Sequence, residues 1–598
     1  MQREHFVSHQ PVLISREETQ AKLDRRNAMA GLHKNSQSYT TAERIEEIVQ
    51  QHGQRVALKY GQQQITYHAM NARINQVAHA LHDAGVRKGD VVALCMENRP
   101  GFFYVWFGLA KLGATVAFIN TNVNGRILAH ALQASSATKA VVGEECSAQF
   151  KAPELDSNLI CWTWPEEDQA AGLSLLADAA STDNPPAAWR AGLTAGDPAV
   201  YIFTSGTTGL SKAALISHAR WLMTGDVMQE TVSASQTDCF YCFLPLYHGA
   251  AALSAAATAF TVGASLAVRR KFSTREFWSD VRQFNVTICQ YVGEICRYLL
   301  NSPAQANDHQ HNLRKMLGTG MTAEIWEKFI GRFGDMQIYE SWGATESNTN
   351  TLNLDNRVGS CGRVPFWEKT NLRLVRFDVE TETHIRDANG RFQLCAPGEA
   401  GEAIGMILDI PDSMAGRFEG YTSAEASEKK VLRNVFKDGD AWWSSGDLLR
   451  CDEDGYCWFV DRIGDTYRWK SENVSTLEVA DSLADLPGLE LVTVYGVQVP
   501  GIEGRAGMAA VVMQEGQVFD AKKFYDLASA RLPRYAQPLF VRLTPVADMT
   551  GTYKLRKVDL QREGFDRSKI SDTLLVRDLT AACYVPLTDE ALQRALAS

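Results

Sequence analysis

The alternation of strand-like and helix-like segments in the first half of this chain limits its fold more than any other feature. The apolar runs "VVALCM", "ATVAFI" and "KAVV" are separated by the helical patterns "FFYVWFGLAKL" and "RILAHALQA". Strands that are joined through helices pair in parallel, so the alternation predicts an α/β fold with a largely parallel sheet and helices on both faces. The pattern continues to about residue 350.

A capping box marks the point where we expect the fold to begin. Thr40 stands three residues before Glu43 in "TTAERIEEIV", a pattern that opens helices. Apolar residues at helical spacing then predict a helix from Tyr67 to Gly85, which closes it. Residues 1–40 are predicted to be a polar arm.

The character of the sequence changes twice in its second half. A chain of 598 residues is too long for one compact core, so two or more domains are expected. Near residue 355, alternating runs with Asn-Gly and Asp-Gly turns, such as "GDLLRCDEDGYCWFVDR", predict hairpins. Beyond about Asp465 the units become shorter and predict a small α+β domain. We therefore expect a large domain at 41–462 and a small mobile domain at 463–598.

Composition argues against two broad classes of protein. A hydrophobic content of 45% with 22% charged residues is ordinary for a globular protein and argues against a largely disordered chain. The net charge is −10, and the acidic residues are spread along the chain, which argues against a nucleic-acid partner held through phosphate contacts. An anionic small ligand would need a local basic site.

Two long apolar stretches resemble membrane spans. Residues 102–119 contain Lys111 and Gly113, and residues 250–268 are rich in alanine with Gly263 near the end. Each therefore predicts a buried helix that runs into a buried strand. The first twenty residues contain no apolar leader segment. We expect a cytoplasmic protein and leave open a peripheral contact with the inner face of a membrane.

The twelve cysteines are scattered, and we expect them to be free thiols. Cys239 and Cys242 form a Cys-x-x-Cys pair that lacks a second ligand pair at zinc spacing. Buried small apolar residues are therefore favoured over a metal or redox site.

The loop in "YIFTSGTTGLSKAALISHA" has the composition of a phosphate cradle. It follows an apolar run, its glycines let several backbone N–H groups point inward, and its hydroxyls add donors. Lys212 supplies a compact positive charge. The loop is not a Walker motif, because Leu210 and Ser211 separate Gly209 from the lysine. A glycine-rich turn without a ligand is the alternative.

Three further stretches carry residues suited to a nucleotide. In "YESWGATE", Glu346 is a hard oxygen ligand suited to Mg²⁺ and Trp342 offers a flat surface to a base. Asp447 in "SSGDLLR" is a carboxylate able to accept hydrogen bonds from ribose hydroxyls. "TGTYKLRK" ends in lysines on a Gly/Thr turn. Taken singly, each also suits a solvated surface or an ordinary core.

The order of the motifs resembles the adenylate-forming superfamily of acyl-CoA synthetases, luciferases and peptide-synthetase adenylation domains. The motifs are "YIFTSGTTGLSK", "PLYHG", "YESWGATE", "SSGDLLR", "DRIGDTYRWKSENV", "PRYAQP" and "TGTYKL". "ENRPGFFYVWFGLAKLGATVAFINTN" and "QYVGEICRYLL" are most similar to the branch of fatty acid transport proteins and very-long-chain acyl-CoA synthetases. The resemblance extends from about residue 40 to the end and implies a β-barrel-like subdomain within the large domain.

The resemblance implies a ligase that uses ATP, Mg²⁺ and coenzyme A. A carboxylate would attack the α-phosphate of ATP and release pyrophosphate, and the thiol of CoA would then displace AMP. Such a transfer needs positioning and charge neutralisation more than covalent help from the protein. The implied phosphate-holding residues are Thr204, Ser205, Gly206, Thr207, Thr208, Gly209 and Lys212.

The remaining nucleotide residues are assigned by the same resemblance. Thr345 would touch the α-phosphate and Glu346 would hold Mg²⁺. Asp447, with help from Arg462, would accept the ribose hydroxyls. The implied adenine-facing residues are Trp342 and Gly343 on one side and Gly318, Thr319 and Gly320 on the other.

Lys554 of "TGTYK" would bridge the α-phosphate and the attacking carboxylate, with Thr345, Glu346 and His248 as the other catalytic candidates. Many relatives have Asp or Lys where this chain has Gly464, the expected hinge, and glycine leaves the backbone free to turn there. The residues implied for the pantetheine tunnel after the small domain turns are Ser471, Glu472 and Asn473. The residues implied near the acyl group are Tyr247, His248, Tyr291 and Gly293, for which a core role is the alternative.

We expect a long-chain or very-long-chain fatty acyl-CoA synthetase. "LPLYHGAAALSAAATAF" and "VTICQYVGEICRYLL" offer small and apolar walls without an evident charge to fix a polar acid. One alternative is a CoA ligase for another bulky acid, such as a steroid side chain, a carnitine-like acid or an aromatic acid. Another is an uptake protein that traps the acid as its thioester. The formation of a homodimer is left as an open alternative.

Overall fold

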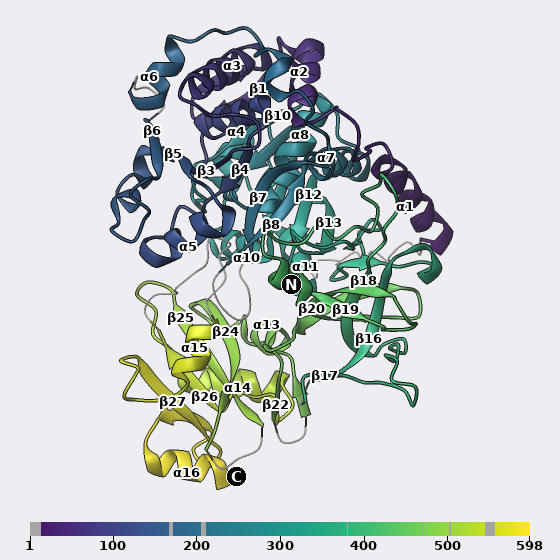
Figure 1. Cartoon of the computed structure of the whole chain (residues 1–598). Helices are drawn as coiled ribbons and strands as arrows, with labels where there is room; N and C mark the ends of the chain where they lie inside the picture. The colour runs from purple at the N-terminus through teal and green to yellow at the C-terminus, as the bar shows by residue number, and fades with distance from the viewer. Residues whose placement is uncertain are drawn as a thin grey trace.

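The computed structural model describes residues 14–166, 171–204, 211–379, 381–469, 472–500, 504–544 and 557–597. Figure 1 shows two large sheets with their helices in the upper part and the elements from α13 onward below them. The predicted alternation of strands and helices is present in both large sheets.

The first large sheet has eight strands in the order β14-β13-β12-β11-β9-β10-β1-β2. All of its pairings are parallel except the two at its edges, β1 with β2 and β13 with β14. Its strands are β1 (Val56–Tyr60), β2 (Gln63–Thr66), β9 (Cys239–Cys242), β10 (Ser265–Val268), β11 (Ile288–Val292), β12 (Lys315–Thr319), β13 (Gln337–Trp342) and β14 (Thr351–Leu352).

The second large sheet has six strands in the order β6-β5-β3-β4-β7-β8. Only the hairpin of β7 with β8 is antiparallel. Its strands are β3 (Val91–Cys95), β4 (Thr115–Phe118), β5 (Lys139–Gly143), β6 (Ile160–Trp164), β7 (Pro198–Thr204) and β8 (Lys212–Ser217).

One hydrophobic cluster joins the two sheets through the helices that pack on them. Every residue of α4 (Pro100–Leu112) is buried, which explains its apolar composition. The capping box predicted at Thr40 and Glu43 opens α2 and is confirmed. The other helices of this part are α2 (Thr41–His52), α3 (Tyr67–Asp83), α5 (Gly125–Ser135), α6 (Gly172–Asp178), α7 (His218–Val232), α8 (Ala257–Val262), α9 (Phe277–Gln283), α10 (Gly293–Asn301) and α11 (Ala323–Phe333).

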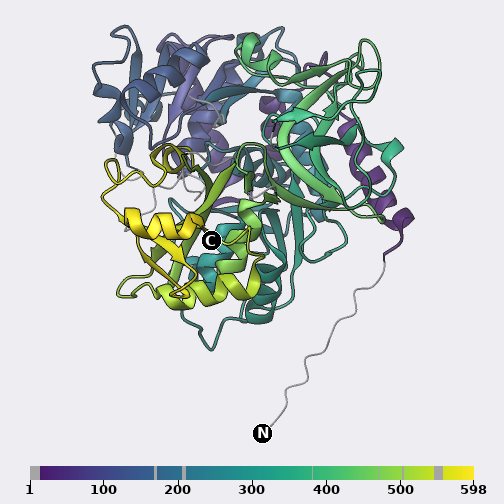
Figure 2. The same cartoon turned by 90° about the horizontal axis from the view of Figure 1, so that it is seen from below.

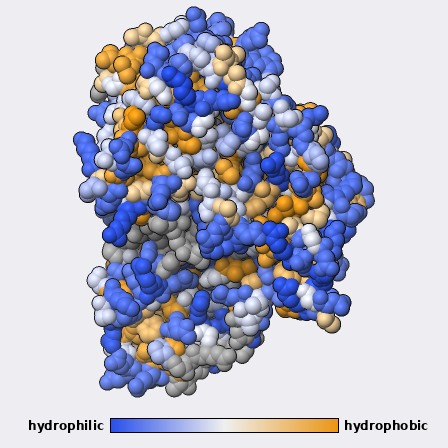
Figure 3. All heavy atoms as spheres, in the orientation of Figure 1, coloured by the Kyte–Doolittle hydropathy of each residue, from blue (hydrophilic) through white to orange (hydrophobic). Residues whose placement is uncertain are grey.

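Both long apolar stretches are buried elements of this core. The first forms α4 and β4, and the second forms a π-helix (Ala250–Ala256), α8 and β10, as predicted. Across the described residues, no helix combines the length and the apolar character that crossing a membrane requires. The face shown in Figure 3 is largely hydrophilic, with separated hydrophobic areas.

The predicted polar arm contains a helix, α1 (Arg16–Ala30), that the sequence analysis missed. Its capping box is formed by Ser15 and Glu18, the same signal that marks α2. The helix is polar and packs beside α7, where Arg25 and Glu230 form an ion pair of 3.2 Å. Figure 2 shows α1 in purple at the edge of the fold. Lys22 Nζ lies 3.0 Å from a buried carboxylate, that of Asp355.

A third sheet has seven strands and contains the predicted hairpins. Its order is β15-β21-β20-β18-β16-β17, with β19 paired to β20, and no pairing among the described residues closes the predicted barrel-like subdomain into a barrel. Its strands are β15 (Gly362–Arg363), β16 (Leu372–Asp378), β17 (Thr383–His384), β18 (Ala400–Met406), β19 (Val431–Arg433), β20 (Ala441–Cys451) and β21 (Tyr456–Arg462), with the short helix α12 (Ala424–Glu428) before β19.

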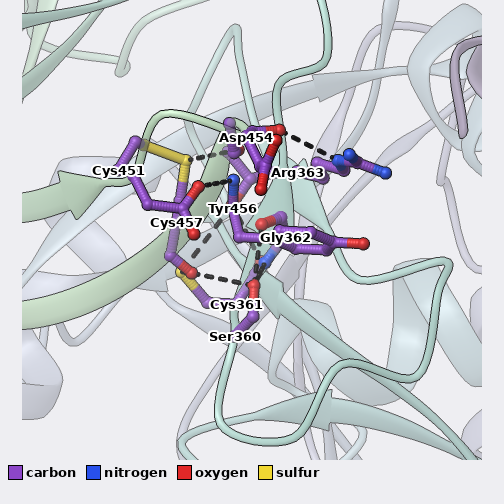
Figure 4. Close-up of a disulfide and its surroundings, with 11 residues drawn as sticks. Ser360, Cys361, Gly362, Arg363, Cys451, Asp454, Tyr456 and Cys457 are labelled. Carbon is purple, nitrogen blue, oxygen red and sulfur yellow. Dashed lines mark hydrogen bonds between the residues drawn. A yellow bond between two sulfur atoms is a disulfide. The ribbon is translucent and has the colours of Figure 1, made fainter. Parts of the chain in front are cut away.

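The expectation that all cysteines are free is wrong for one pair. Cys451 and Cys457 form a disulfide between β20 and β21 (Figure 4). The Asp-Gly turn brings the two residues directly opposite each other in the strand register, with a Cα–Cα distance of 4.1 Å. Cys361 lies beside this pair as a buried free thiol, and burial raises its pKa to about 12. Cys239 and Cys242 are buried and free in β9.

The C-terminal part has its own hydrophobic cluster, from Tyr467 to Ala595. A five-stranded sheet, β24-β25-β26-β27-β28, forms its centre, and the predicted α+β pattern is present. Its elements are β22 (Tyr467–Trp469), β23 (Glu472–Val474), α13 (Thr476–Leu483), β24 (Leu489–Gln498), β25 (Arg505–Met513), α14 (Ala521–Arg531), β26 (Phe540–Leu543), α15 (Lys557–Glu563), β27 (Thr573–Asp578), β28 (Cys583–Pro586) and α16 (Asp589–Ala597).

Ion pairs connect this part to the first large sheet's helices. Lys328 on α11 lies 2.6 Å from Asp485, just after α13, and Asp485 also pairs with Arg531 on α14. Arg297 on α10 lies 3.9 Å from Asp481 on α13.

Candidate functional site

Several predicted site residues stand at the carboxyl ends of strands in the two large sheets. Thr204 ends β7, Thr319 ends β12 and Trp342 ends β13, while Tyr291 lies one residue before the end of β11. In open α/β sheets, ligands bind outside the carboxyl ends of the strands. The motifs are therefore placed where such a fold offers a site.

The predicted phosphate loop joins β7 to β8. Thr204 and Lys212 lie opposite each other in the hairpin register, and both are half-buried. The loop residues between them that the motif named lie outside the described residues: Ser205, Gly206, Thr207, Thr208 and Gly209. Their assignment stays a prediction.

Tyr421, which the sequence analysis did not single out, contacts three of the predicted site residues. Lys212 Nζ lies 5.4 Å from the centre of its ring, and its hydroxyl donates a hydrogen bond of 2.8 Å to Glu346 Oε1. Burial, and then the Glu346 carboxylate, raises the pKa of Tyr421, while a hydrogen bond with Thr204 acts against that rise. The ring is 5% exposed.

Arg220 on α7 holds the loop that carries Thr345 and Glu346. Its guanidinium donates to the backbone oxygens of Thr345 and Ser347 at 2.8 and 2.7 Å. On the opposite side, a Cβ added to Gly249 would stand 2.9 Å from Thr345 Oγ1. The "PLYHG" and "GATE" motifs are therefore in contact.

The residues predicted for adenine and ribose are joined directly. The Trp342 indole N–H donates to Asp447 Oδ2 at 2.9 Å, and Arg462 faces Asp447 across β20 and β21 with a closest charge distance of 3.6 Å. The backbone of β20 just before Asp447 is held by Glu402, which accepts from the N–H of Gly446 at 2.9 Å. Glu402 was not found from the sequence.

The turn predicted to face adenine is held from below by Glu340. This carboxylate is 3% exposed and accepts from the backbone N–H groups of Gly320 and Met321. The hydroxyl of Tyr291 donates to the same carboxylate. A Cβ on Gly293 would stand 1.7 Å from the Gly320 oxygen, so this position requires glycine for packing. These contacts explain Tyr291 and Gly293 through support of the turn, and their predicted acyl contact stays a prediction.

Tyr247 and His248 follow β9 of the first large sheet, and Tyr247 contacts Asn122, which follows β4 of the second. Tyr247 is 5% exposed and its hydroxyl accepts from Asn122 at 3.3 Å. Burial lowers the pKa of His248 to about 4, so its imidazole is neutral near pH 7. The buried His248 Nε2 has no hydrogen-bond partner among the described residues, which leaves it available to a ligand.

The C-terminal candidates are only partly described. Lys554 and Ser471 lie outside the described residues, and Glu472 and Asn473 form β23, which pairs with β22. Gly464 has a φ of +90°, and open space surrounds the position where a Cβ would stand. The hinge prediction thus falls on a backbone conformation that favours glycine.

The Glu346 carboxylate suits a magnesium ion whose other ligands would be water and phosphate oxygens. No cluster of three or more His, Cys, Asp or Glu side chains able to hold a metal occurs in the described part of the chain. Mg²⁺ commonly binds one or two carboxylates and completes its shell with water and substrate phosphates. Glu346 is half-buried, and its Oε2 makes no hydrogen bond to a described residue.

Comparison with known proteins gives consistent matches. The family described as "AMP-binding enzyme" matches residues 45–404. Long-chain fatty acid transport protein 2 of Rattus norvegicus is 41% identical over 544 residues, which are 89% of this chain and 87% of that protein. An anthranilate CoA ligase in complex with anthranoyl-AMP has a TM-score of 0.72 at 21% identity, covering 88% of this chain and 97% of its own. A fatty acyl CoA synthetase of Mycobacterium tuberculosis has a TM-score of 0.61 at 21% identity, covering 88% and 98%.

Proposed function

This chain belongs to the AMP-binding enzyme family, and from that premise we propose that it is an AMP-forming acyl-CoA synthetase for long-chain or very-long-chain fatty acids. The acid is first joined to AMP with loss of pyrophosphate, and CoA then replaces AMP. A carboxylate oxygen is a poor leaving group and AMP is a good one, which is why the nucleotide is needed.

One observation carries this proposal above the others. Tyr421 contacts Thr204, Lys212 and Glu346, so the two ends of the phosphate loop and the metal-binding candidate lie in one cluster. Hydroxyl, ammonium and carboxylate groups that converge in this way suit the polyphosphate of ATP. We assign the phosphate loop to the β- and γ-phosphates.

We assign the residues for ribose, adenine and the α-phosphate by their chemistry and position. Asp447 accepts hydrogen bonds from the ribose hydroxyls, and the Trp342 indole fixes the orientation of the Asp447 carboxylate. Thr319 and Gly320 are exposed at the end of β12 and offer a backbone edge to adenine. Thr345 faces the α-phosphate, where charge develops in the transition state.

Magnesium, held by Glu346 and the phosphates, would supply positive charge that neutralises the phosphate oxygens. The role of Arg220 is to keep the backbone of Thr345 and its neighbours in place while Glu346 holds the ion. Lys212 adds a cation over the ring of Tyr421.

The acid is assigned to the region beside His248. The π-helix that follows it is formed mostly of alanine and is mostly buried, so it offers an apolar wall with little side-chain bulk. A neutral His248 with a free ring nitrogen can meet a carboxylate oxygen as a hydrogen-bond donor. The similarity to long-chain fatty acid transport proteins supports a long acyl chain over an aromatic or steroid acid.

We divide the chain into a large unit to Arg462 and a small unit that turns at Gly464. In this division Lys554 belongs to the small unit and the phosphate loop to the large one. Turning the small unit between the half-reactions would exchange Lys554 for Ser471, Glu472 and Asn473 near the site. The separate hydrophobic cluster from Tyr467 onward supports a unit that can move as a whole.

A pyrophosphate-release assay with Mg·ATP and acids of increasing chain length tests the proposal. We expect release to rise with long-chain acids, and an acyl-CoA product to be found by mass spectrometry when CoA is added. Glu346→Gln should abolish most of this release, while Glu368→Gln, at an exposed position, should retain it. Pyrophosphate release only with aromatic or carnitine-like acids would show that the substrate is such an acid and not a long-chain fatty acid.

Uptake by acyl trapping is the second candidate, since the similar rat protein is described as a fatty acid transport protein. Trapping a fatty acid inside the cell requires the formation of its CoA thioester, which is the ligase reaction itself. Uptake would therefore be an additional role of the same site. If no acid supports pyrophosphate release with CoA and Mg·ATP present, the ligase proposal fails and binding of fatty acid alone remains.

A further inference from the structure

The segment around Tyr421 is attached by its backbone to the strand that carries Lys212. Leu215 N–H donates to the Gly420 oxygen and Thr422 N–H donates to the Ala213 oxygen, each at 3.0 Å. Ala214 and Tyr421 therefore face each other as an antiparallel bridge. This pairing fixes where the Tyr421 side chain leaves the backbone, two residues along β8 from Lys212.

The side chain of Tyr421 is held equally closely. Its ring is 5% exposed, and the Lys212 ammonium lies over the ring at a distance that allows a cation–π contact. Its hydroxyl reaches Glu346 Oε1 at 2.8 Å, while Oε2 makes no hydrogen bond with a described residue. Tyr421 thus selects the carboxylate oxygen that stays available to an ion.

A second connection joins the start of α7 to the loop that carries Glu346. Arg220 follows β8 at the start of α7 and donates to the backbone oxygens of Thr345 and Ser347. Arg220 fixes the backbone of the loop that carries Glu346, and Tyr421 fixes the side chain. Without these two contacts, the half-buried Glu346 carboxylate would be free to adopt several rotamers.

We propose that Tyr421 is a positioning residue for Mg·ATP, which orients the Glu346 carboxylate for the metal ion and holds Lys212 for the phosphates. The inference rests on the proposed nucleotide site and adds a residue to it. Tyr421 acts through Glu346 and Lys212 and needs no contact with the ion. The hydroxyl contacts Glu346 and the ring contacts Lys212. Substitution by Phe removes only the first contact, and substitution by Leu removes both.

Tyr421→Phe keeps the ring and removes the hydroxyl. We expect the dissociation constant of Mg·ATP, measured by isothermal titration calorimetry on the full chain, to rise about tenfold, the size of a hydrogen bond to a charged group. The dissociation constant of ATP in EDTA should change by less than about twofold, because the lysine contact remains. Tyr421→Leu should weaken ATP binding under both conditions.

Tyr456→Phe is the matched control. Its hydroxyl donates to a carboxylate as well, that of Asp355 at 3.3 Å, but no predicted nucleotide residue is involved. We expect it to leave both dissociation constants within about twofold of those of the wild type. In a Glu346→Gln background, Tyr421→Phe should add less than about twofold, because the two residues act as a unit.

The ratio of the two dissociation constants decides the outcome, because a partial loss of folded protein does not change it. If Tyr421→Phe leaves that ratio as in the wild type, the inference is overturned. The binding of Mg·ATP can be measured without the acid. If the ratios are as expected but no acid gives pyrophosphate release, the role of Tyr421 is supported and the proposed synthetase activity is refuted. Failure of the wild type to bind Mg·ATP would overturn both.

Discussion

The indole N–H of Trp342 donates a hydrogen bond of 2.9 Å to Asp447 Oδ2, which joins the end of β13 to the third sheet. Trp342 is 4% exposed, and its ring belongs to the hydrophobic cluster of the third sheet. Its polar edge fixes the carboxylate that we assign to ribose. A base would meet only a limited part of so buried a ring, so we expect the main contribution of Trp342 to be the orientation of Asp447.

Trp342→Phe should therefore raise the KM for ATP with little change in kcat. A lost hydrogen bond to a charged acceptor corresponds to about 1.5 kcal/mol, or roughly tenfold. Trp443→Phe is the control, since Trp443 is buried in the same cluster and its N–H has no partner among the described residues. Equal effects of the two substitutions in steady-state kinetics would mean that packing alone accounts for Trp342.

Lys554→Ala should separate the two half-reactions. We expect loss of acyl-adenylate formation, because the lysine would bridge the α-phosphate and the attacking carboxylate, with thioester formation from supplied acyl-AMP retained. Pyrophosphate exchange measures the first half-reaction, and acyl-CoA formed from synthetic acyl-AMP measures the second. Lys569→Ala removes an exposed lysine of the same part of the chain and should affect neither. An equal loss in both half-reactions would contradict the turn at Gly464.

Much of the fold follows from local signals in the sequence. The capping box at Thr40, the alternating apolar runs and the Asp-Gly turn after β20 each specify an element without help from distant residues. Helix α1 shows the limit, because its capping box at Ser15 is present but its weak apolar face gave no periodic pattern.

The candidate site also contains residues that the sequence predicted and residues that it did not. Glu346, Lys212 and Asp447 were predicted because each carries chemistry that suits one part of a nucleotide. Tyr421 and Arg220 were not predicted, because their partners come from distant parts of the chain. Tyr421 is brought to Lys212 by a bridge to Ala214, and Arg220 reaches Thr345, which lies 125 residues further along the chain. No spacing in the sequence encodes such a contact.

The disulfide of Cys451 and Cys457 should stabilise the hairpin of β20 and β21. It closes a loop with a sequence separation of 6. Closure of so short a loop removes unfolded-chain entropy worth about 2 kcal/mol. In denaturant titrations, dithiothreitol should lower the stability of the wild type by about that amount and leave a Cys451→Ser/Cys457→Ser variant unchanged.

Cys161→Ser, at an exposed free cysteine, is the control and should retain the response to dithiothreitol. A wild type that shows no response would mean that the bridge adds nothing to the free energy of unfolding. Because β20 also carries Asp447, the KM for ATP measured with and without the reductant reports whether the effect reaches the site.

His218 should make the protein sensitive to mild acid. It is the first residue of α7, its Nδ1 hydrogen-bonds Thr41 Oγ1 at 2.9 Å, and its buried Nε2 has no partner among the described residues. Burial lowers the pKa of His218 from 6.5 to about 4. Between these values the unfolded chain binds a proton that the folded protein does not.

The contribution of this group is therefore complete above pH 6.5 and is lost as the pH falls towards 4. The difference amounts to about 3 kcal/mol. His218→Asn keeps a polar group near Thr41 and removes the titration, so its free energy of unfolding should fall less steeply over this range than that of the wild type. His309→Asn, at an exposed position, should follow the wild type. Parallel curves for all three proteins in urea titrations at several pH values would show that the buried imidazole does not govern acid stability.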